Sequence, residues 1–408
     1  MTYIVQKFGG TSVGDIGRIE HVANIIASEV KKKNKVIAIV SAMSQETNRL
    51  VKLVKETTSI YDGREYDGIV STGENVTAGL LSIKLQNIGI PARSWLGWQI
   101  PILTTDMHTD ARIQEINREN IERKFNEGMK VAVVAGFQGI SSENRITTLG
   151  RGGSDTTAVA ISATFGAERC DIFTDVEGVF TTDPRIVKNA RKLDVIAYEE
   201  MLELSSLGAK VLHTRSVELA MRYGVRLQVL SSFEEKNGTL VCREDKMLES
   251  KIISGISCSK EEAKITLTGV DDKPGVAAAI FGPLSESGIN VDMIIQNISE
   301  NNSTDLTFSC PSSQVLAAEE AIKMASKKKE ISFKTHIIDA NVAKVSLVGI
   351  GMRSHTGIAK KMFEALANEN INILVISTSE IKISILVEQK YMELAVQTLH
   401  DAFELEKP

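Results

Sequence analysis

The chain has 408 residues, of which 43% are hydrophobic and 24% charged, so we expect a folded protein of two or three domains. Its formal net charge of -5 lacks the basic excess of a nucleic-acid-binding protein, and no apolar run reaches the ~18 residues of a membrane helix. The N-terminal apolar run ends at Gln6, which argues against a signal peptide. The four cysteines are widely spaced and form no C-x-x-C pair, which favours free thiols. We therefore expect a cytoplasmic protein with free thiols, no nucleic-acid partner and no membrane association.

Residues 1–243 alternate short β-branched runs with longer helical patterns, which is typical of βαβ units around a parallel sheet. The clearest predicted helices are 18–33 and 73–86. Continuous apolar runs favour strands buried on both faces. The predicted strands are Tyr3 to Val5, Val36 to Val40, Val131 to Ala135, Asp171 to Thr174 and Leu227 to Leu230.

Two glycine-rich turns are candidate anion sites. In the first, the strand at Tyr3 leads through Lys7 to Gly9-Gly10 and a helix, so backbone amides, a helix dipole and a lysine could meet a phosphate, although a plain βα turn is an alternative. In the second, Gly150-Arg-Gly-Gly-Ser-Asp155 precedes an apolar helix. There the alternative is that Ser154 or Asp155 only caps the helix.

Arg243 to Ser250 is a polar stretch, and we expect a linker at 244–254. Beyond it the chain repeats itself at a spacing of about 80 residues, as in Lys264-Ile-Thr-Leu-Thr-Gly and Lys344-Val-Ser-Leu-Val-Gly. Each copy is predicted to run strand, turn, helix, strand, strand, helix, strand. The copies at 255–340 and 341–408 resemble the ACT domain, a small α+β (ferredoxin-like) module that senses ligands.

The whole chain resembles the aspartokinases. The similarity rests on segments that occur in this order: Lys7-Phe-Gly-Gly-Thr-Ser, Ser71-Thr-Gly-Glu74, Gly136-Phe-Gln-Gly139, Gly150-Arg-Gly-Gly-Ser-Asp155, Thr181-Thr-Asp-Pro-Arg185 and Gly208-Ala-Lys-Val-Leu-His213. The resemblance implies an α/β fold, with an amino-acid-kinase-type, mostly parallel sheet flanked by helices, followed by two ACT domains. It also implies transfer of the γ-phosphoryl group of ATP, with Mg²⁺, to L-aspartate.

A carboxylate acceptor has an ordinary pKa of about 3.9, so it is already ionised at neutral pH and requires no general base. By resemblance, Lys7 and Lys210 stabilise the transferred phosphoryl group, Asp155 holds the lysines, and no protein metal ligand is expected. His213 is interpreted as structural. The nucleotide-contacting positions implied by the family are Lys7, Phe8, Gly9, Gly10, Thr174, Asp175, Phe180, Arg185, Lys210 and Val211. Position 180 is often tyrosine in the family, so a hydroxyl contact from this side chain is missing.

Aspartate must be held by its α-carboxylate and α-ammonium groups, which leaves its β-carboxylate free to react. Arg151 suits the carboxylate, because guanidinium and carboxylate can form a bidentate pair, and Glu74 suits the ammonium. The remaining substrate positions implied by the family are Ser41, Thr47, Phe137 and Ser154.

The tandem ACT copies predict feedback regulation by an end-product amino acid. Lysine, alone or with threonine, is preferred, and threonine alone is the alternative; stabilisation or oligomerisation are the simpler roles. The turn before residue 276 offers helix N-terminal amides, and Asp292 suits an ammonium. The predicted effector positions, the last three by resemblance, are Asp272, Gly275, Ala277, Asn290, Val291, Asp292, Gln296, Asn372, Ser379 and Glu380.

Three alternatives stay open. A related kinase acting on glutamate, acetylglutamate or carbamate would share the lysine and glycine anchors, and a non-catalytic amino-acid sensor could use the same scaffold. Met247 could be an internal start that gives a separate regulatory subunit and an α2β2 assembly, in place of a homo-oligomer.

Overall fold

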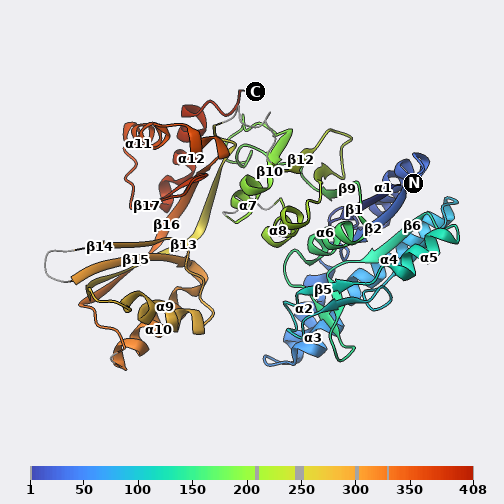
Figure 1. Cartoon of the computed structure of the whole chain (residues 1–408), viewed down its shortest axis with the longest axis horizontal. Helices are drawn as coiled ribbons and strands as arrows, with labels where there is room; N and C mark the ends of the chain where they lie inside the picture. The colour runs from blue at the N-terminus through green and yellow to red at the C-terminus, as the bar shows by residue number, and fades with distance from the viewer. Residues whose placement is uncertain (1, 207–210, 244–251, 299–302, 329, 408) are drawn as a thin grey trace. The chain divides into compact units, whose positions relative to one another are not determined.

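The computed structural model describes residues 2–206, 211–243, 252–298, 303–328 and 330–407 (Figure 1). The chain divides into two compact units. The first comprises 1–180, 192–206 and 210–248, and the second comprises 181–191, 207–209 and 249–408. The predicted linker at 244–254 lies mostly outside the described residues, as does Met247.

The first unit is built on an eight-stranded sheet in the order β10-β12-β11-β9-β1-β2-β6-β3, and its only antiparallel pair is β11 with β12. The strands of this sheet are β1 (Tyr3–Phe8), β2 (Lys35–Val40), β3 (Ala92–Trp95), β6 (Val131–Ala135), β9 (Arg169–Thr174), β10 (Val195–Ala197), β11 (Leu227–Ser231) and β12 (Thr239–Cys242). All five residues of β6 are buried, as expected for a strand covered on both faces. The mostly parallel sheet predicted from the sequence is confirmed.

Helices cover both faces of this sheet. On one face, apolar residues of α1 and α4 pack with β1, β2 and β6 in one core, and on the other, α6 contacts β1, β2 and β9. The helices are α1 (Ile16–Lys31), α2 (Glu46–Thr57), α3 (Gly63–Val70), α4 (Thr72–Asn87), α5 (Glu119–Asn126), α6 (Gly153–Phe165), α7 (Tyr198–Ser206) and α8 (Thr214–Tyr223). A smaller sheet, β5-β4-β7-β8, consists of β4 (Ile102–Thr104), β5 (Ile113–Ile116), β7 (Gln138–Ile140) and β8 (Ile146–Thr148).

The second unit contains the two repeats, joined by a six-stranded sheet in the order β14-β15-β13-β16-β18-β17. Its strands are β13 (Gly255–Asp271), β14 (Ile294–Ile298), β15 (Ser303–Pro311), β16 (Thr335–Val348), β17 (Val375–Thr378) and β18 (Lys382–Glu388). Its α-helices are α9 (Val276–Glu286), α10 (Val315–Lys327), α11 (Ile358–Asn368) and α12 (Met392–Ala402). Separate apolar cores form under α9 with α10 and under α11 with α12.

The predicted order of elements is wrong at the end of the second repeat, because no strand follows α12 among the described residues. Its place in the sheet is taken by the first five residues of β13, where Gly255 pairs with Val348 and Ser259 with Lys344. The later part of β13 pairs with the start of β16 in the first repeat. The sheet therefore crosses the expected boundary at 340/341, and the segment 255–259 completes the second repeat.

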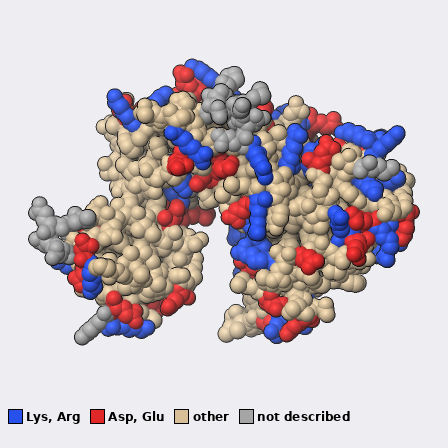
Figure 2. All heavy atoms as spheres, viewed as in Figure 1, with Lys and Arg blue, Asp and Glu red and all other residues tan. Residues whose placement is uncertain are grey.

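Acidic and basic side chains are interspersed over the face of each unit seen in Figure 2. Within the described residues, no helix is both long enough and apolar enough to cross a bilayer.

Candidate active site

The carboxyl ends of β1, β2, β6 and β9 gather most of the residues predicted for catalysis. From β1 the chain continues to β2 on one side, while β9 lies on the other side, so strand order reverses between β1 and β9. Ligands of open α/β sheets bind in the crevice at such a reversal. Lys7 lies at this point, since it pairs with Ile39 of β2 and with Ile172 of β9.

An ion pair joins the first strand to helix α6. Lys7 Nζ lies 2.6 Å from Asp155 Oδ1, and each side chain is only 12% exposed. The predicted proximity of these two residues is thus present in the fold. Gly152, with φ of 67°, is the N-cap of α6, so Ser154 and Asp155 lie in the first turn and the alternative that either one caps the helix is excluded.

The first glycine turn differs from its prediction. Helix α1 begins at Ile16 with Asp15 as its N-cap, so its N-terminus is not at Gly9-Gly10. The Gly9 amide donates a hydrogen bond of 3.3 Å to Phe173 O, which ties the turn to β9. A β-carbon on Gly9 would lie 3.5 Å from Lys7 Nζ, so the lysine folds back over the turn. Because the Gly9 amide is already bonded, the Gly10 amide is the better candidate to donate a hydrogen bond to a phosphate.

Glu74 provides a buried carboxylate beside the segment that follows β2. It lies in the first turn of α4, is 3% exposed, and accepts a hydrogen bond of 3.1 Å from Ala42 N with Oε1. Its Oε2 is buried and has no hydrogen-bond partner in the described structure. Burial raises the pKa of Glu74 to about 7, and the bond from Ala42 offsets this only in part. A buried acceptor without a partner is suited to a cationic ligand group.

The other predicted substrate residues lie around the same strand ends. Ser41 follows β2 and donates its amide to Phe8 O at 3.1 Å, and Thr47 is in the first turn of α2. Phe137 follows β6 with φ of 69° and donates its amide to Thr157 Oγ1 on α6 at 3.2 Å. A β-carbon at Gly136 would lie 2.8 Å from Ser154 Oγ, so glycine permits β6 and α6 to approach closely here.

Arg151 is exposed and lines a cavity of about 550 Å³ at the start of α6. The cavity is also lined by Thr109, Asp110, Arg112, Gly150, His213, Thr214, Arg215 and Glu218. His213 packs against Gly152, where a β-carbon would approach to 2.3 Å. Asp110 lies 3.3 Å from Arg112 and 3.7 Å from Arg215, so Arg151 is the arginine of this lining best suited to the carboxylate of a ligand.

The predicted nucleotide residues are partly brought together. Thr174 ends β9 and donates to Asp175 Oδ1 at 3.1 Å, whereas Phe180 lies farther along the chain and bridges to Lys192. Arg185 belongs to the second unit, where it pairs with Asp183 at 2.6 Å, and Val211 precedes α8. Lys210 lies outside the described residues.

The sequence pattern missed a second set of contacts near Thr174. Ser232 donates its amide to Thr174 O at 2.9 Å, and its hydroxyl lies 2.8 Å from Ser12 Oγ. Arg18 Nη2 donates to Ser232 O at 2.6 Å, and its guanidinium stacks 3.8 Å from the centre of the Phe233 ring. Ser232 is 58 positions from Thr174, 214 from Arg18 and 220 from Ser12, so no local signal in the sequence could have identified this cluster.

Comparison with known proteins agrees with this arrangement. The amino acid kinase family matches residues 2–231, and the ACT domain matches 264–323 and 345–403. An aspartate kinase of Stutzerimonas stutzeri is 52% identical over 409 residues, covering 100% of this chain and 98% of that protein. The chain belongs to the aspartate kinases. It is therefore a phosphotransferase of this family, as the residues at the strand ends suggested.

Two solved structures of E. coli aspartokinase III are similar to this aspartate kinase along almost its whole length. Both are 26% identical to it and cover 98% of this chain and 99% of that one. The complex with aspartate and ADP, named as the R-state, has a TM-score of 0.82. The complex with lysine and aspartate, named as the T-state, has a TM-score of 0.77. The fold predicted from the sequence is confirmed over both units.

Proposed function

We propose that this aspartate kinase transfers the γ-phosphoryl group of ATP to the β-carboxylate of L-aspartate and forms 4-phospho-L-aspartate and ADP. The observation that carries the proposal is the Lys7–Asp155 pair of 2.6 Å at the strand reversal, within the unit that also holds the unpartnered carboxylate oxygen of Glu74. The similarity to a kinase that was solved with aspartate and ADP supports the same substrates here.

In this reaction a β-carboxylate oxygen attacks the γ-phosphorus, and the bond from that phosphorus to the β,γ-bridging oxygen breaks. Both reacting groups are anions, so catalysis depends on positioning and on neutralising charge. Lys7 is the described cation for this task, and Asp155 fixes its ammonium in place. Lys210 is proposed as the second cation and the Gly10 amide as a further donor. ATP enters as its magnesium complex, to which we assign no protein ligand.

Substrate recognition follows from the charges around the site. Glu74 binds the α-ammonium of aspartate with Oε2, and the incoming cation favours the ionised form of this carboxyl group. Arg151 binds the α-carboxylate through its guanidinium. Ser41, Thr47, Phe137 and Ser154 surround the carbon skeleton. On the nucleotide side we propose Phe8, Gly9, Thr174, Asp175, Phe180, Arg185 and Val211.

A coupled assay of ADP release tests this activity. We expect turnover with L-aspartate and much less with glutamate, acetylglutamate or carbamate. Activity with one of those acids in preference to aspartate would contradict the proposed substrate. No ADP release with any of them, from protein that still binds an amino acid, would favour a sensor on the kinase scaffold.

We also propose that the enzyme catalyses the first step towards lysine, threonine and methionine, with feedback by lysine, alone or with threonine. The E. coli structure that was solved with lysine supports a lysine effector. The seven predicted effector residues of the first repeat fall into two groups. Asp272, Gly275 and Ala277 surround the N-terminus of α9, which has Gly275 as its N-cap, while Asn290, Val291, Asp292 and Gln296 lie just before β14 or on it.

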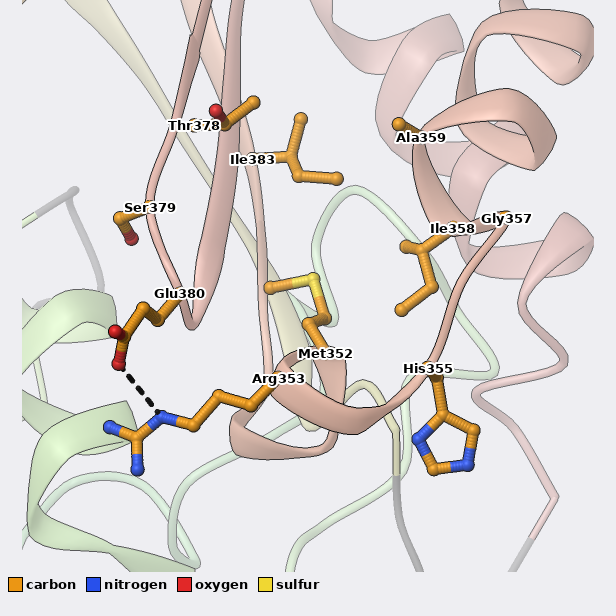
Figure 3. A pocket seen from close by; sticks show the side chains of 10 residues that line it. All are labelled: Met352, Arg353, His355, Gly357, Ile358, Ala359, Thr378, Ser379, Glu380 and Ile383. Atoms are coloured by element: carbon orange, nitrogen blue, oxygen red, sulfur yellow. Dashed lines mark ion pairs between the residues drawn. The ribbon is translucent and has the colours of Figure 1, made fainter.

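The second repeat contributes beside the β14 segment and in a separate cavity of its own. Met293 and Ile295 pack with Leu374 and Val375 in one apolar cluster, which joins the segment after Asp292 to the segment after Asn372. Ser379 and Glu380 instead line a cavity of about 500 Å³ in the second repeat, with Met352, Arg353, His355, Gly357, Ile358, Ala359, Thr378 and Ile383 (Figure 3). We propose both places as parts of the effector-binding surface.

The cavity in Figure 3 has the chemistry to hold an amino acid. Glu380 Oε2 lies 3.3 Å from Arg353 Nε, so carboxylate and guanidinium stand on one side, and the N-terminus of α11 follows Gly357. Ile358 and Ile383 supply apolar contacts. An ammonium group would be bound by Glu380, and a carboxylate by the first amides of α11 on the opposite side of the cavity.

The assembly is proposed to be a homo-oligomer, or an α2β2 complex if translation also begins at Met247. Mass spectrometry of the native protein distinguishes the two, because an internal start would yield a second, shorter chain. The expected cytoplasmic location stays a prediction; the four cysteines, including buried Cys170 and Cys310, carry free thiols.

A further inference from the structure

The loop that carries Arg151 is anchored from outside by a side chain that no sequence motif indicated. Segments 108–111 and 148–151 run side by side, and Ala111 donates its amide to Thr148 O at 2.9 Å. Arg215, in the first turn of α8, reaches both segments. Its Nη1 donates to Leu149 O at 2.7 Å and its Nη2 donates to Ala111 O at 2.7 Å. The Arg215 side chain is 11% exposed, so these bonds are shielded from water.

The same two segments are held at a second point by Asp67, which is fully buried on α3. Its carboxylate accepts hydrogen bonds from Thr109 N at 3.0 Å and from Thr148 Oγ1 at 2.5 Å, and it lies 2.8 Å from His108 Nδ1. Asp67 on α3 and Arg215 on α8 therefore both fix the backbone immediately before Gly150.

This anchoring matters because the chain beyond it has little support of its own. Gly150 and Gly152, which flank Arg151, both have positive φ, at 72° and 67°. Glycine permits this conformation but loses more conformational entropy than other residues when it is ordered. The direction of the exposed Arg151 side chain then depends on where Leu149 is held, two residues earlier.

We propose that Arg215 is a positioning residue for aspartate recognition, which acts by holding Leu149 and Ala111 so that the guanidinium of Arg151 meets the α-carboxylate of the substrate. The proposal rests on the role proposed above for Arg151. We expect that a lysine cannot replace Arg215, because the two carbonyl groups are bound by two different nitrogens of a rigid, planar guanidinium, whereas a lysine offers one nitrogen on a flexible chain.

The test compares the steady-state kinetics of Arg215→Ala, Arg215→Lys, Arg151→Ala and the double variant. We expect Arg215→Ala to raise KM for aspartate about 10- to 100-fold, the effect of losing charge-assisted hydrogen bonds, and to change KM for ATP less than threefold. Arg215→Lys should show the same selective defect. Millimolar guanidinium ion should partly restore Arg215→Ala. The matched control is Arg222→Ala, since Arg222 is exposed near the end of the same helix.

The double variant separates positioning from a general structural role. If Arg215 acts through Arg151, adding Arg215→Ala to Arg151→Ala should not raise KM for aspartate further. Additive effects, equal changes in both KM values, or a parent-like Arg215→Lys would overturn the proposal. If Arg215→Ala fails to fold, Arg215→Lys alone decides the outcome. An Arg151→Ala variant with a parent-like KM for aspartate would instead disprove the substrate role of Arg151.

Discussion

The Lys344 ammonium lies 2.5 Å from Asp292 Oδ2, the carboxylate that the sequence suggested for an effector ammonium. Lys344 is also 2.8 Å from Glu262 Oε1 and is 5% exposed. Although burial opposes it, the two carboxylates raise the pKa of Lys344. Asp292 keeps 45% of its side chain exposed, so an effector ammonium would have to share this carboxylate with Lys344 or displace it.

Asp292→Ala should relieve feedback inhibition while uninhibited activity stays within about twofold. Lys344 would keep its bond to Glu262, so we expect a loss of only about 1 kcal/mol in the free energy of unfolding. The measurement is a pair of inhibition curves for lysine and threonine, separately and together. Asp271→Ala is the control, because Asp271 is an exposed carboxylate in the same repeat. Parent-like inhibition of the Asp292 variant would remove this residue from the effector site.

Lys7→Ala should lose about 10²- to 10⁴-fold in kcat while remaining folded, because it removes a preorganised charge from the transition state. Asp155→Asn should lower kcat less than Lys7→Ala does, since Lys7 would keep its charge but not its fixed position. Lys210→Ala is expected to resemble Lys7→Ala. Turnover is measured at saturating ATP and aspartate, with the exposed Lys32→Ala as control. Near-normal kcat in both lysine variants would contradict the proposed mechanism.

Glu74 predicts a pH dependence in aspartate recognition. Because burial raises its pKa to about 7, the carboxylate that binds the substrate ammonium forms only as the pH approaches and passes 7. kcat/KM for aspartate should therefore rise with pH up to about 7 and level off above it. Glu74→Gln should lower kcat/KM about 10- to 100-fold and remove this step. An unchanged pH profile in Glu74→Gln would show that another group titrates.

The same carboxyl group predicts the sign of a stability effect that serves as a control. Its pKa in the folded state lies above 4.5, so the folded protein binds the proton more tightly than the unfolded chain does. This group's contribution to the free energy of unfolding therefore falls as pH rises from about 4.5 through about 7. At pH 8, Glu74→Gln should be at least as stable as the parent in thermal unfolding. A large loss of stability would mean that its kinetic defect reflects misfolding.

Local pattern was sufficient for five strands of the main sheet and for the Gly150–Asp155 turn before α6, because buried strands and βα turns have characteristic residues. It missed β3, β10 and β12, and it placed the N-terminus of a helix at the Gly9-Gly10 turn, whereas α1 begins at Ile16. The partnership of Lys7 with Asp155 came from the family resemblance, and the fold brings the two together across 148 positions of sequence. The roles of Arg215, Asp67 and Lys344 could not be predicted, since each depends on which distant segments the folded chain brings together. The sequence pattern also failed for the strand expected after α12, whose place in the sheet is taken by residues 255–259. The pairing of 255–259 with β16 follows from a sheet register that neither repeat specifies alone.

The cavity of the second repeat is lined by an acid, Glu380, that can test whether an effector binds there (Figure 3). Glu380→Gln would remove the partner proposed for an effector ammonium and would also break the 3.3 Å pair with Arg353. That pair is exposed and contributes little to stability, so the variant should fold and turn over like the parent. If an amino acid binds here, its half-inhibitory concentration should rise at least about tenfold, the effect of one lost charge-assisted bond.

Glu364→Gln is the control, because Glu364 is an exposed acid on α11. Inhibition curves for lysine and threonine that match the parent's would show that neither effector uses this cavity. A shift for only one of them would assign the cavity to that amino acid.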